Sequence, residues 1–290
     1  MVNPVAATRK RPPERAKGEH MISDEISLRK FVNTHRSIIY GMMLGDSGIS
    51  QRGRASRFGV WHCLDQEDYL WHKHKLLQDV AEEVKRYVNE EKGREYFYFS
   101  TCSGVEWQKV WSTFHQDSVK KTVGNTTYIP KVVTRQILSA LDDHGVALWF
   151  MDDGHLSCWL HPSGTRYQQF FKLSTCGFTD RENELIIEWM KERYGIKARL
   201  AHQRNKIEEG VYRTYPFICL GREAYRVIRD RIAPFVPECM DYKIDIKDPP
   251  LSGQGRLPDV RADEDALRAS GKPEEATGNE SPASSVEVTK

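Results

Sequence analysis

The stretch Val146-Ala-Leu-Trp-Phe-Met-Asp-Asp-Gly154 is an apolar run that ends in two adjacent carboxylates and a glycine. Its apolar part predicts a buried helix, and a glycine is typical of the residue that follows a helix. Two acids at a helix C-terminus face the negative end of the helix dipole, which disfavours them. A bound cation would offset that repulsion, so the pattern indicates a cation site.

A second stretch, Ile38-Ile-Tyr-Gly-Met-Met-Leu-Gly-Asp-Ser-Gly48, repeats this pattern with one acid. Alignment of Asp46 with Asp153 places the two stretches 107 residues apart, about the length of one small domain. Gly41 and Gly45 stand four residues apart and therefore share one helix face. Such glycines, together with Ala147, predict that the two helices pack closely and bring their acidic ends side by side.

Composition is that of a soluble globular protein, with 39% hydrophobic and 29% charged residues. No apolar run reaches the roughly 18 residues that a membrane span needs, so we expect no membrane partner. The cysteines are scattered without a CxxC pair, which predicts reduced thiols in a cytoplasmic-type compartment of unknown host or organelle. The formal net charge is only +2, so the overall charge does not indicate the class of binding partner, and local charged patches must be considered instead.

Hydrophobic periodicity predicts an α+β fold with the order helix-β-β-helix-β-β-helix twice. We expect a disordered basic arm over residues 1–22, one domain over 23–128, a second over 129–248 and a disordered tail over 249–290. In the first domain the pattern predicts helices over 24–44, 69–88 and 105–115, strands over 58–64 and 96–101, and a loop over 120–125. In the second it predicts a helix over 146–152, strands over 154–160 and 166–175, a helix over 179–194, strands over 198–202 and 215–220, and a helix over 222–232.

The paired acids favour phosphoryl-transfer chemistry. Asp46 and Asp153 at neighbouring helix ends could share divalent cations, as two-metal phosphoryl chemistry requires. Oxygen ligands without a His/Cys cluster favour Mg²⁺ over zinc. Asp152 is interpreted as a helix-end acid at the interface and not as a ligand. The predicted strands carry Arg, Gln, Asn, Thr and Tyr, which are side chains that read base edges in the major groove.

Both acidic stretches resemble the signature of the LAGLIDADG homing endonucleases, and Ala147–Gly154 resembles the second motif of the two-motif, single-chain members. The segments Ser174–Asp180, Ile232–Pro237 and Met240–Ile244 agree with the same family. The resemblance implies two pseudo-symmetric αββαββα domains that form a DNA-binding saddle, with the motif helices at the interface. It also implies a monomer that cleaves both strands of a long double-stranded DNA site with Mg²⁺, or with Mn²⁺ as a substitute.

By position, the resemblance makes Asp46 and Asp153 the metal-binding catalytic carboxylates and Lys243 a catalytic basic residue beside one site. Under the saddle arrangement, polar residues placed mainly on predicted hairpin turns become DNA contacts: Arg52, Arg54, Arg57, His62, Gln203, Arg204, Asn205 and Lys206.

The chain departs from the family pattern at two kinds of position. Thr127 stands where many relatives carry a lysine, and Lys120, Lys121 or Lys131 could take its place. His62 and Cys176 stand where glutamine is common. These differences leave a nicking or slow enzyme open. Two further alternatives stay open as well: an intron RNA splicing cofactor (a maturase) on the same fold, and a DNA-binding protein that does not cleave.

Overall fold

The computed structural model describes residues 24–245, except 53–54, 91–92, 117, 124–125, 161–165 and 209–210. The predicted terminal segments, 1–22 and 249–290, lie outside the described residues. The described residues of both predicted domains fall within one compact unit. No helix among the residues described is long and apolar enough to cross a membrane.

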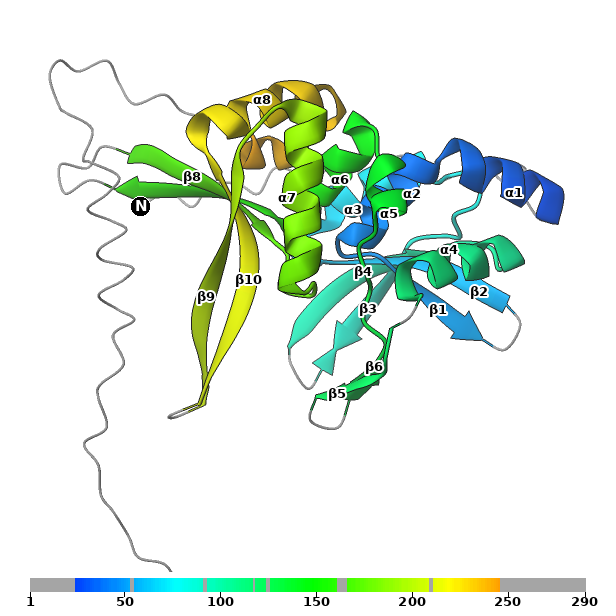
Figure 1. Ribbon diagram of the computed structural model, residues 1–290. Coiled ribbons are helices and arrows are strands. Elements are labelled where there is room, and N and C mark those ends of the chain that lie inside the picture. The colour runs from blue at the N-terminus through cyan, green and yellow to red at the C-terminus, as the bar shows by residue number, and fades with distance from the viewer. Residues whose placement is uncertain are drawn as a thin grey trace, which may run out of the picture. The chain divides into compact units, whose positions relative to one another are not determined.

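The chain folds as two halves with the same order of elements (Figure 1). The first half contains α1 (Glu25–Thr34), α2 (Arg36–Leu44), β1 (Gly48–Arg52), β2 (Ala55–Cys63), α3 (Glu67–Leu76), β3 (Lys85–Asn89), β4 (Arg94–Ser100) and α4 (Val105–His115). The second contains α6 (Asp143–Asp153), β7 (Gly154–Leu160), β8 (Arg166–Ser174), α7 (Asp180–Tyr194), β9 (Ala198–Glu208), β10 (Val211–Gly221) and α8 (Arg222–Ile232).

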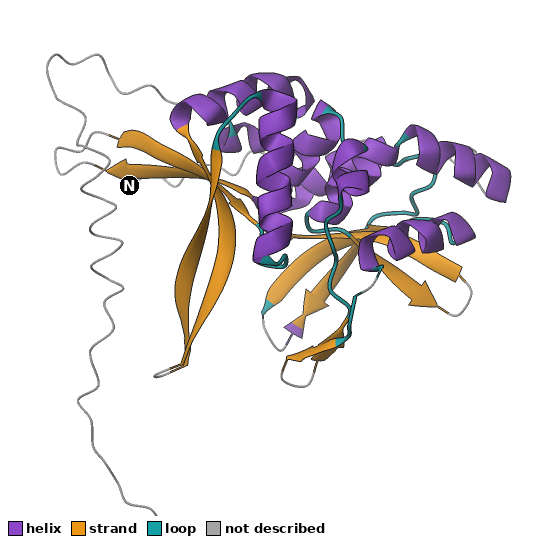
Figure 2. Cartoon of the chain, viewed as in Figure 1, coloured by secondary structure: helices purple, strands orange, loops and turns teal. Residues whose placement is uncertain are grey.

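The two four-stranded antiparallel sheets have equivalent strand orders, β1-β2-β4-β3 and β7-β8-β10-β9. This equivalence confirms the predicted α+β fold of two αββαββα halves. Helices gather on one side of the strands in each half (Figure 2). In the first sheet, alternate residues such as Phe58, Val60 and Phe99 are fully buried beneath the helices.

Several elements differ from the sequence-based expectation. The predicted helix over 24–44 is two helices, because the backbone of His35 leaves the helical region, and its ring Nδ1 donates to the Phe31 carbonyl. The predicted helix over 69–88 ends at Leu76, and residues 85–89 form strand β3 instead. Cross-strand pairing explains the change, since Arg86 pairs with Glu95 and Tyr87 lies opposite Tyr96.

Two other segments contain more strand than predicted. Part of the segment over 120–125, expected as loop, belongs to a hairpin of β5 (Lys121–Val123) and β6 (Thr126–Tyr128). Strands β9 and β10 extend to 208 and from 211, and they form a long hairpin (Figure 1). A short helix α5 (Arg135–Ser139) then connects the hairpin of β5 and β6 to α6. The capping box of Thr179 and Glu182 and the left-handed Gly195 delimit α7, in agreement with the predicted helix over 179–194.

Helices α2 and α6 pack directly against each other at the centre of the molecule, through glycines (Figure 1). A Cβ at Gly41 would lie 2.0 Å from the Gly145 carbonyl oxygen, and one at Gly145 would lie 2.3 Å from the Ser37 hydroxyl. The two backbones therefore approach too closely for any side chain to fit between them. The predicted role of Gly41 is confirmed, whereas its partner is Gly145 and not the expected Ala147.

We predict that Gly41→Ala lowers the free energy of unfolding by about 1–3 kcal/mol, because the new methyl group meets backbone that cannot move aside. Alanine at an ordinary helix position would instead stabilise by about 1 kcal/mol. Urea unfolding measures the change, and Gly177→Ala, where a Cβ would meet nothing within 4 Å, is the control. Equal stability of Gly41→Ala and the parent protein would contradict the packing described here.

Candidate active site

The two motif acids lie at the C-terminal ends of the packed central helices. Asp153 is the last residue of α6, and Asp46 follows the C-cap of α2, Gly45. The charge of Asp152 raises the pKa of both carboxylates, and the charge of Asp46 also raises the pKa of Asp153, so the three groups share one electrostatic environment. The close helix packing therefore brings the predicted acids together.

A lysine is bonded to the carbonyl groups at the end of each motif helix. Lys131 Nζ donates to the carbonyl oxygens of Gly45 and Ser47, at 2.9 and 2.7 Å. Lys243 Nζ donates to the carbonyls of Met151 and Asp152. Cations at these positions offset the negative ends of the helix dipoles, which the sequence pattern had left without compensation.

The two lysines occupy equivalent places in the two halves. The positive charge of Lys131 acts most strongly on Asp153, among the nearby carboxylates. Among the carboxylates, Asp152 has the strongest electrostatic interaction with Lys243, and Asp46 has the second strongest. Lys131, one of the three lysines proposed to replace the family lysine missing at position 127, lies beside an acid, whereas the side chain of Lys121 lies outside the described part of the chain. Each motif acid therefore has a lysine held at the end of a helix.

A third lysine is buried between the halves. Lys73 of α3 donates from Nζ to both carboxylate oxygens of Asp152, at 2.6 and 2.9 Å, and both side chains are fully buried. Asp152 Oδ2 also accepts the backbone N–H of Asp46 at 3.1 Å. The interpretation of Asp152 as an interface acid agrees with this geometry, since its oxygens are bonded to protein groups.

Burial changes the protonation of the site. Burial, followed by repulsion from Asp152 and Asp46, raises the pKa of Asp153 from 3.8 to about 8. Asp46 is more exposed, and partial desolvation together with the charge of Asp152 raises its pKa as well. Burial lowers the pKa of Lys131 and of Lys243, although the carboxylates oppose this change. The raised pKa values of these acids therefore indicate that an additional positive charge beside them would be favourable.

The two positions where the family commonly has glutamine differ from each other. His62 is 3% exposed, and its Nδ1 lies 2.9 Å from Gln66 Oε1. Burial and the nearby Lys73 lower the pKa of His62 to about 4, so the ring is neutral at physiological pH. Cys176 is exposed and lines a cavity of about 620 Å³ together with Lys131 and Asp153. This cavity gives solvent direct access to the second motif acid.

Each sheet has an open face opposite its helices. In the first sheet, strand alternation places Arg57, Trp61, Lys85, Tyr87 and Tyr98 on this face, where Trp61 stacks on Tyr98 with ring centroids 4.1 Å apart. None of the described side chains that the strands of this sheet place on the face is acidic. A cationic and aromatic face whose strand residues include no acid is typical of a nucleic-acid-binding surface.

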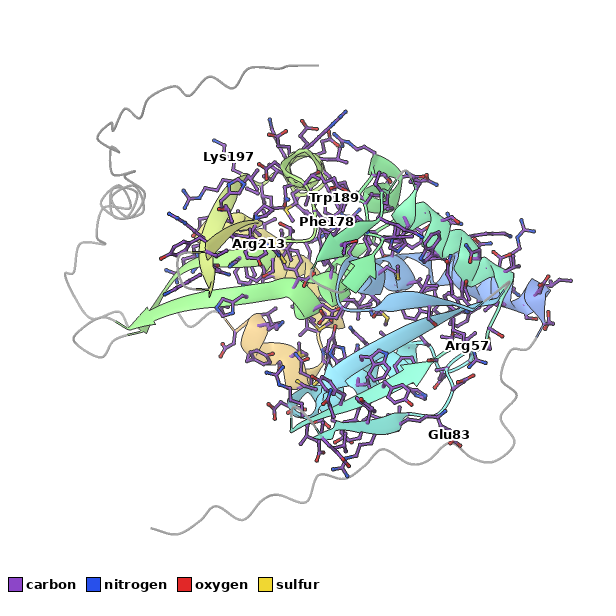
Figure 3. All side chains as sticks on the ribbon, turned by 90° about the horizontal axis from the view of Figure 1, so that it is seen from below. Arg57, Glu83, Phe178, Trp189, Lys197 and Arg213 are labelled. Atoms are coloured by element: carbon purple, nitrogen blue, oxygen red, sulfur yellow. The ribbon has the colours of Figure 1, made fainter. Side chains whose placement is uncertain are left out.

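The open face of the second sheet is similar in character. It carries Lys172, Gln203, Asn205, Arg213 and Tyr215, and Lys172 donates to Gln203. Figure 3, which views the molecule from below, labels Arg57 on the first sheet and Arg213 on the second. The described strand side chains on this second face likewise include no acid. The two sheets thus offer two surfaces of the same chemical kind.

The predicted DNA contacts fall into three groups. Arg54 and the side chain of Arg52 lie outside the described part of the chain. The position of His62 is not compatible with a direct DNA contact, because strand alternation turns it inward. The expectation of hairpin turns is wrong for the remaining residues, which lie within strands: Arg57 in β2 and Gln203, Arg204, Asn205 and Lys206 in β9.

Strand geometry also separates these residues by face. Arg57 is half-exposed and forms an ion pair with Glu82. Gln203 and Asn205 share the open face, whereas Arg204 points to the opposite face and lies over the Tyr212 ring at 4.1 Å. Successive strand residues alternate, so neighbours in sequence cannot all contact one ligand surface.

Sequence reasoning missed Lys73 and Gly145. Lys73 follows Tyr69 by four residues and precedes Leu77 by four, so it occupies a position on the buried face of α3. A charged residue within an apolar stripe indicates a buried partner of opposite charge. The acid pair Asp152–Asp153 was the candidate for that partner in the sequence. Gly145 lies before the apolar run and carried no signal of its own.

We predict that Asp153→Asn stabilises the metal-free protein, and that the gain increases with pH. Because the folded-state pKa lies above 3.8, ionised Asp153 destabilises the fold increasingly as pH rises from about 4 to about 8. Thermal unfolding in EDTA should show little difference at about pH 4 and a gain on the order of a few kcal/mol at about pH 8.5. A gain that does not depend on pH would contradict the assigned burial of this carboxyl.

Comparison with known proteins gives a consistent result. A model of the "LAGLIDADG DNA endonuclease family" matches residues 36–215. The DNA endonuclease I-ChuI of Chlamydomonas applanata is 24% identical over 221 residues, which cover 72% of this chain and 93% of that protein. The cytochrome b mRNA maturase bI2 of Saccharomyces cerevisiae is 22% identical over 245 residues, which cover 79% of this chain and 53% of that protein.

A solved structure shows the same fold. The homing endonuclease I-WcaI, bound to its DNA recognition sequence, superposes with a TM-score of 0.57 at 16% identity, over 78% of this chain and 95% of that one. The matching family model covers more than half of the sequence, from the start of α2 into β10. With both acidic motifs, the pseudo-symmetric fold and this match, the chain belongs to the LAGLIDADG DNA endonuclease family.

Proposed function

We propose that the protein is a site-specific endonuclease that hydrolyses a phosphodiester bond on each strand of a long double-stranded DNA target, with Mg²⁺ as cofactor. The observation that carries this proposal is the meeting of Asp46 and Asp153 at two packed helix ends, each with a lysine bonded to the helix terminus. One acid and one lysine per strand would suit a two-strand cut.

The donor set fits a hard divalent cation. Asp46 and Asp153 offer carboxylate oxygens, and their raised pKa values support the assignment of a cation to this site. Within the described ranges, no group of three or more His, Cys, Asp or Glu residues could hold a metal ion alone. We therefore assign Asp46 and Asp153 to a site that DNA phosphate oxygens and water complete. Such oxygen ligands suit Mg²⁺, with Mn²⁺ as a substitute.

When bound, the cation would supply charge stabilisation at the phosphate and lower the pKa of its water. The protein's own residues do the rest. Lys131 and Lys243 place ammonium groups beside the acids and stabilise negative charge that develops on the phosphate. Both are held by helix carbonyls, so their positions are set before the substrate binds.

The open sheet faces would bind the DNA on both sides of the cut. A two-stranded ribbon such as β9 and β10 fits the major groove, and its Gln203 and Asn205 can bond to base edges. Both motifs and both lysines belong to one chain, so a monomer suffices.

The similarity to a maturase makes intron RNA a second candidate partner. The same open faces carry exposed aromatic side chains, such as Trp61 and Tyr87, on which unpaired bases can stack. Competition of intron RNA with duplex DNA for the protein distinguishes the two. A strong preference for RNA, without any DNA cut, would favour the splicing role.

The cleavage test uses a randomised duplex library with Mg²⁺, followed by sequencing of the ends. We predict double-strand cuts at one long motif, lost in EDTA and lost in Asp46→Asn and in Asp153→Asn because each acid is required. Lys131→Met and Lys243→Met should lower kcat by roughly 10²-fold.

The matched control is Lys197→Met, which removes an exposed lysine outside the site and should cut like the parent. Circular dichroism confirms that each variant is folded. Duplex that is bound but left intact by the parent protein would overturn the endonuclease proposal and leave a DNA-binding protein.

A further inference from the structure

The buried pair of Lys73 and Asp152 lies between the two halves and has no role in the function proposed above. Lys73 also lies 4.6 Å from the centre of the Tyr69 ring, and the Tyr69 hydroxyl donates to the Leu148 carbonyl of α6 at 3.3 Å. Helix α3 of the first half is thereby bonded to helix α6 of the second at two places. The Asp152 carboxylate is fixed in one position by these surroundings.

The bond from Asp46 to this carboxylate replaces a helical bond. Helix α2 ends at Leu44, and the N–H of Gly45 and of Ser47 still donate to α2 carbonyls. The N–H between them, that of Asp46, donates instead to Asp152 Oδ2. The backbone of the first motif acid is therefore held by a side chain of the other half.

The second motif acid has no equivalent of this arrangement. Asp153 lies within α6, and its backbone is part of that helix. Alignment of the two motif acids makes Gly45 the counterpart of Asp152, and glycine has no side chain to accept a bond. The carboxylate of Asp152 fills the space that a side chain at Gly45 would need, since a Cβ there would lie 2.2 Å from Oδ2.

We propose that Asp152, held in place by Lys73, is a positioning residue for Asp46 and makes the two strand-cleaving sites unequal. This inference rests on the proposed endonuclease function only for its effect on cleavage. Loss of the pair would displace Asp46 while Asp153, held by its own helix, stays in place. The hydrolysis of one strand would then slow more than that of the other, and nicked DNA would accumulate.

Two double variants separate positioning from stability. Lys73→Met leaves a buried carboxylate without its partner, so this change alone can unfold the protein. Lys73→Met with Asp152→Leu removes both charges and the acceptor for the Asp46 N–H. Lys73→Met with Asp152→Asn removes both charges but keeps an oxygen that can accept this N–H. Lys75→Met, an exposed lysine of the same helix, is the control.

The first readout is amide hydrogen exchange, measured by NMR on the full chain without DNA. We expect the exchange of the Asp46 amide to rise by about tenfold or more in the leucine variant, with no change in the asparagine variant or at Asp153. Unchanged exchange at Asp46 in a folded leucine variant would overturn the positioning role. This result does not depend on whether the protein cuts DNA.

The second readout is cleavage of a supercoiled plasmid that carries the target found in the library. The leucine variant should accumulate nicked circles, with one fixed strand slowed about tenfold more than the other. The asparagine variant and Lys75→Met should linearise the plasmid as the parent does. Equal slowing of both strands in the leucine variant would overturn the proposed inequality. A parent protein that never cuts would instead reject the endonuclease proposal, and the exchange data would still decide the role of Asp152.

Discussion

The structure depends on the contact between two backbones, where helix α2 meets helix α6 without side chains between them. Gly41 and Gly145 make this approach possible, and Ser37 extends it by donating to Asp142 at the start of α6. The contact aligns the two helices side by side and in the same direction, so their C-terminal ends lie next to each other. Because each helix continues into the first strand of its sheet, the same contact also sets where the two sheets begin.

A concentration of charge follows from that geometry. The carboxylates of Asp46, Asp152 and Asp153 stand together with three lysines, at the negative ends of two helix dipoles. The lysines are not interchangeable. Lys73 forms a buried ion pair with Asp152. Lys131 and Lys243 instead donate to backbone carbonyls at the C-terminal ends of α2 and α6, beside the two motif acids. The Asp152 carboxylate is therefore paired within the protein, whereas we propose that Asp46 and Asp153 bind a cation.

Much of the fold could be predicted from the sequence because its signals are local. The acidic ends, the glycines at helical spacing and the capping box of Thr179 each act within one turn. The predictions from sequence were wrong where contacts with residues distant in the sequence determine the structure. Residues 85–89 follow a helical pattern but pair with β4, and the residues after 202 continue as strand because β10 lies beside them. Lys73 could not be assigned to Asp152 from sequence, since 79 residues separate them and the contact exists only across the interface.

We propose that Asp46 and Asp153 bind the divalent cations at the junction of the two helices. Crystals of the protein with its target duplex and Mn²⁺ would test it through anomalous scattering. We predict Mn²⁺ peaks in contact with the carboxylates of both Asp46 and Asp153 and with DNA phosphate oxygens. A fully formed complex with Mn²⁺ at other residues, or with no Mn²⁺ peak at either acid, would contradict the account.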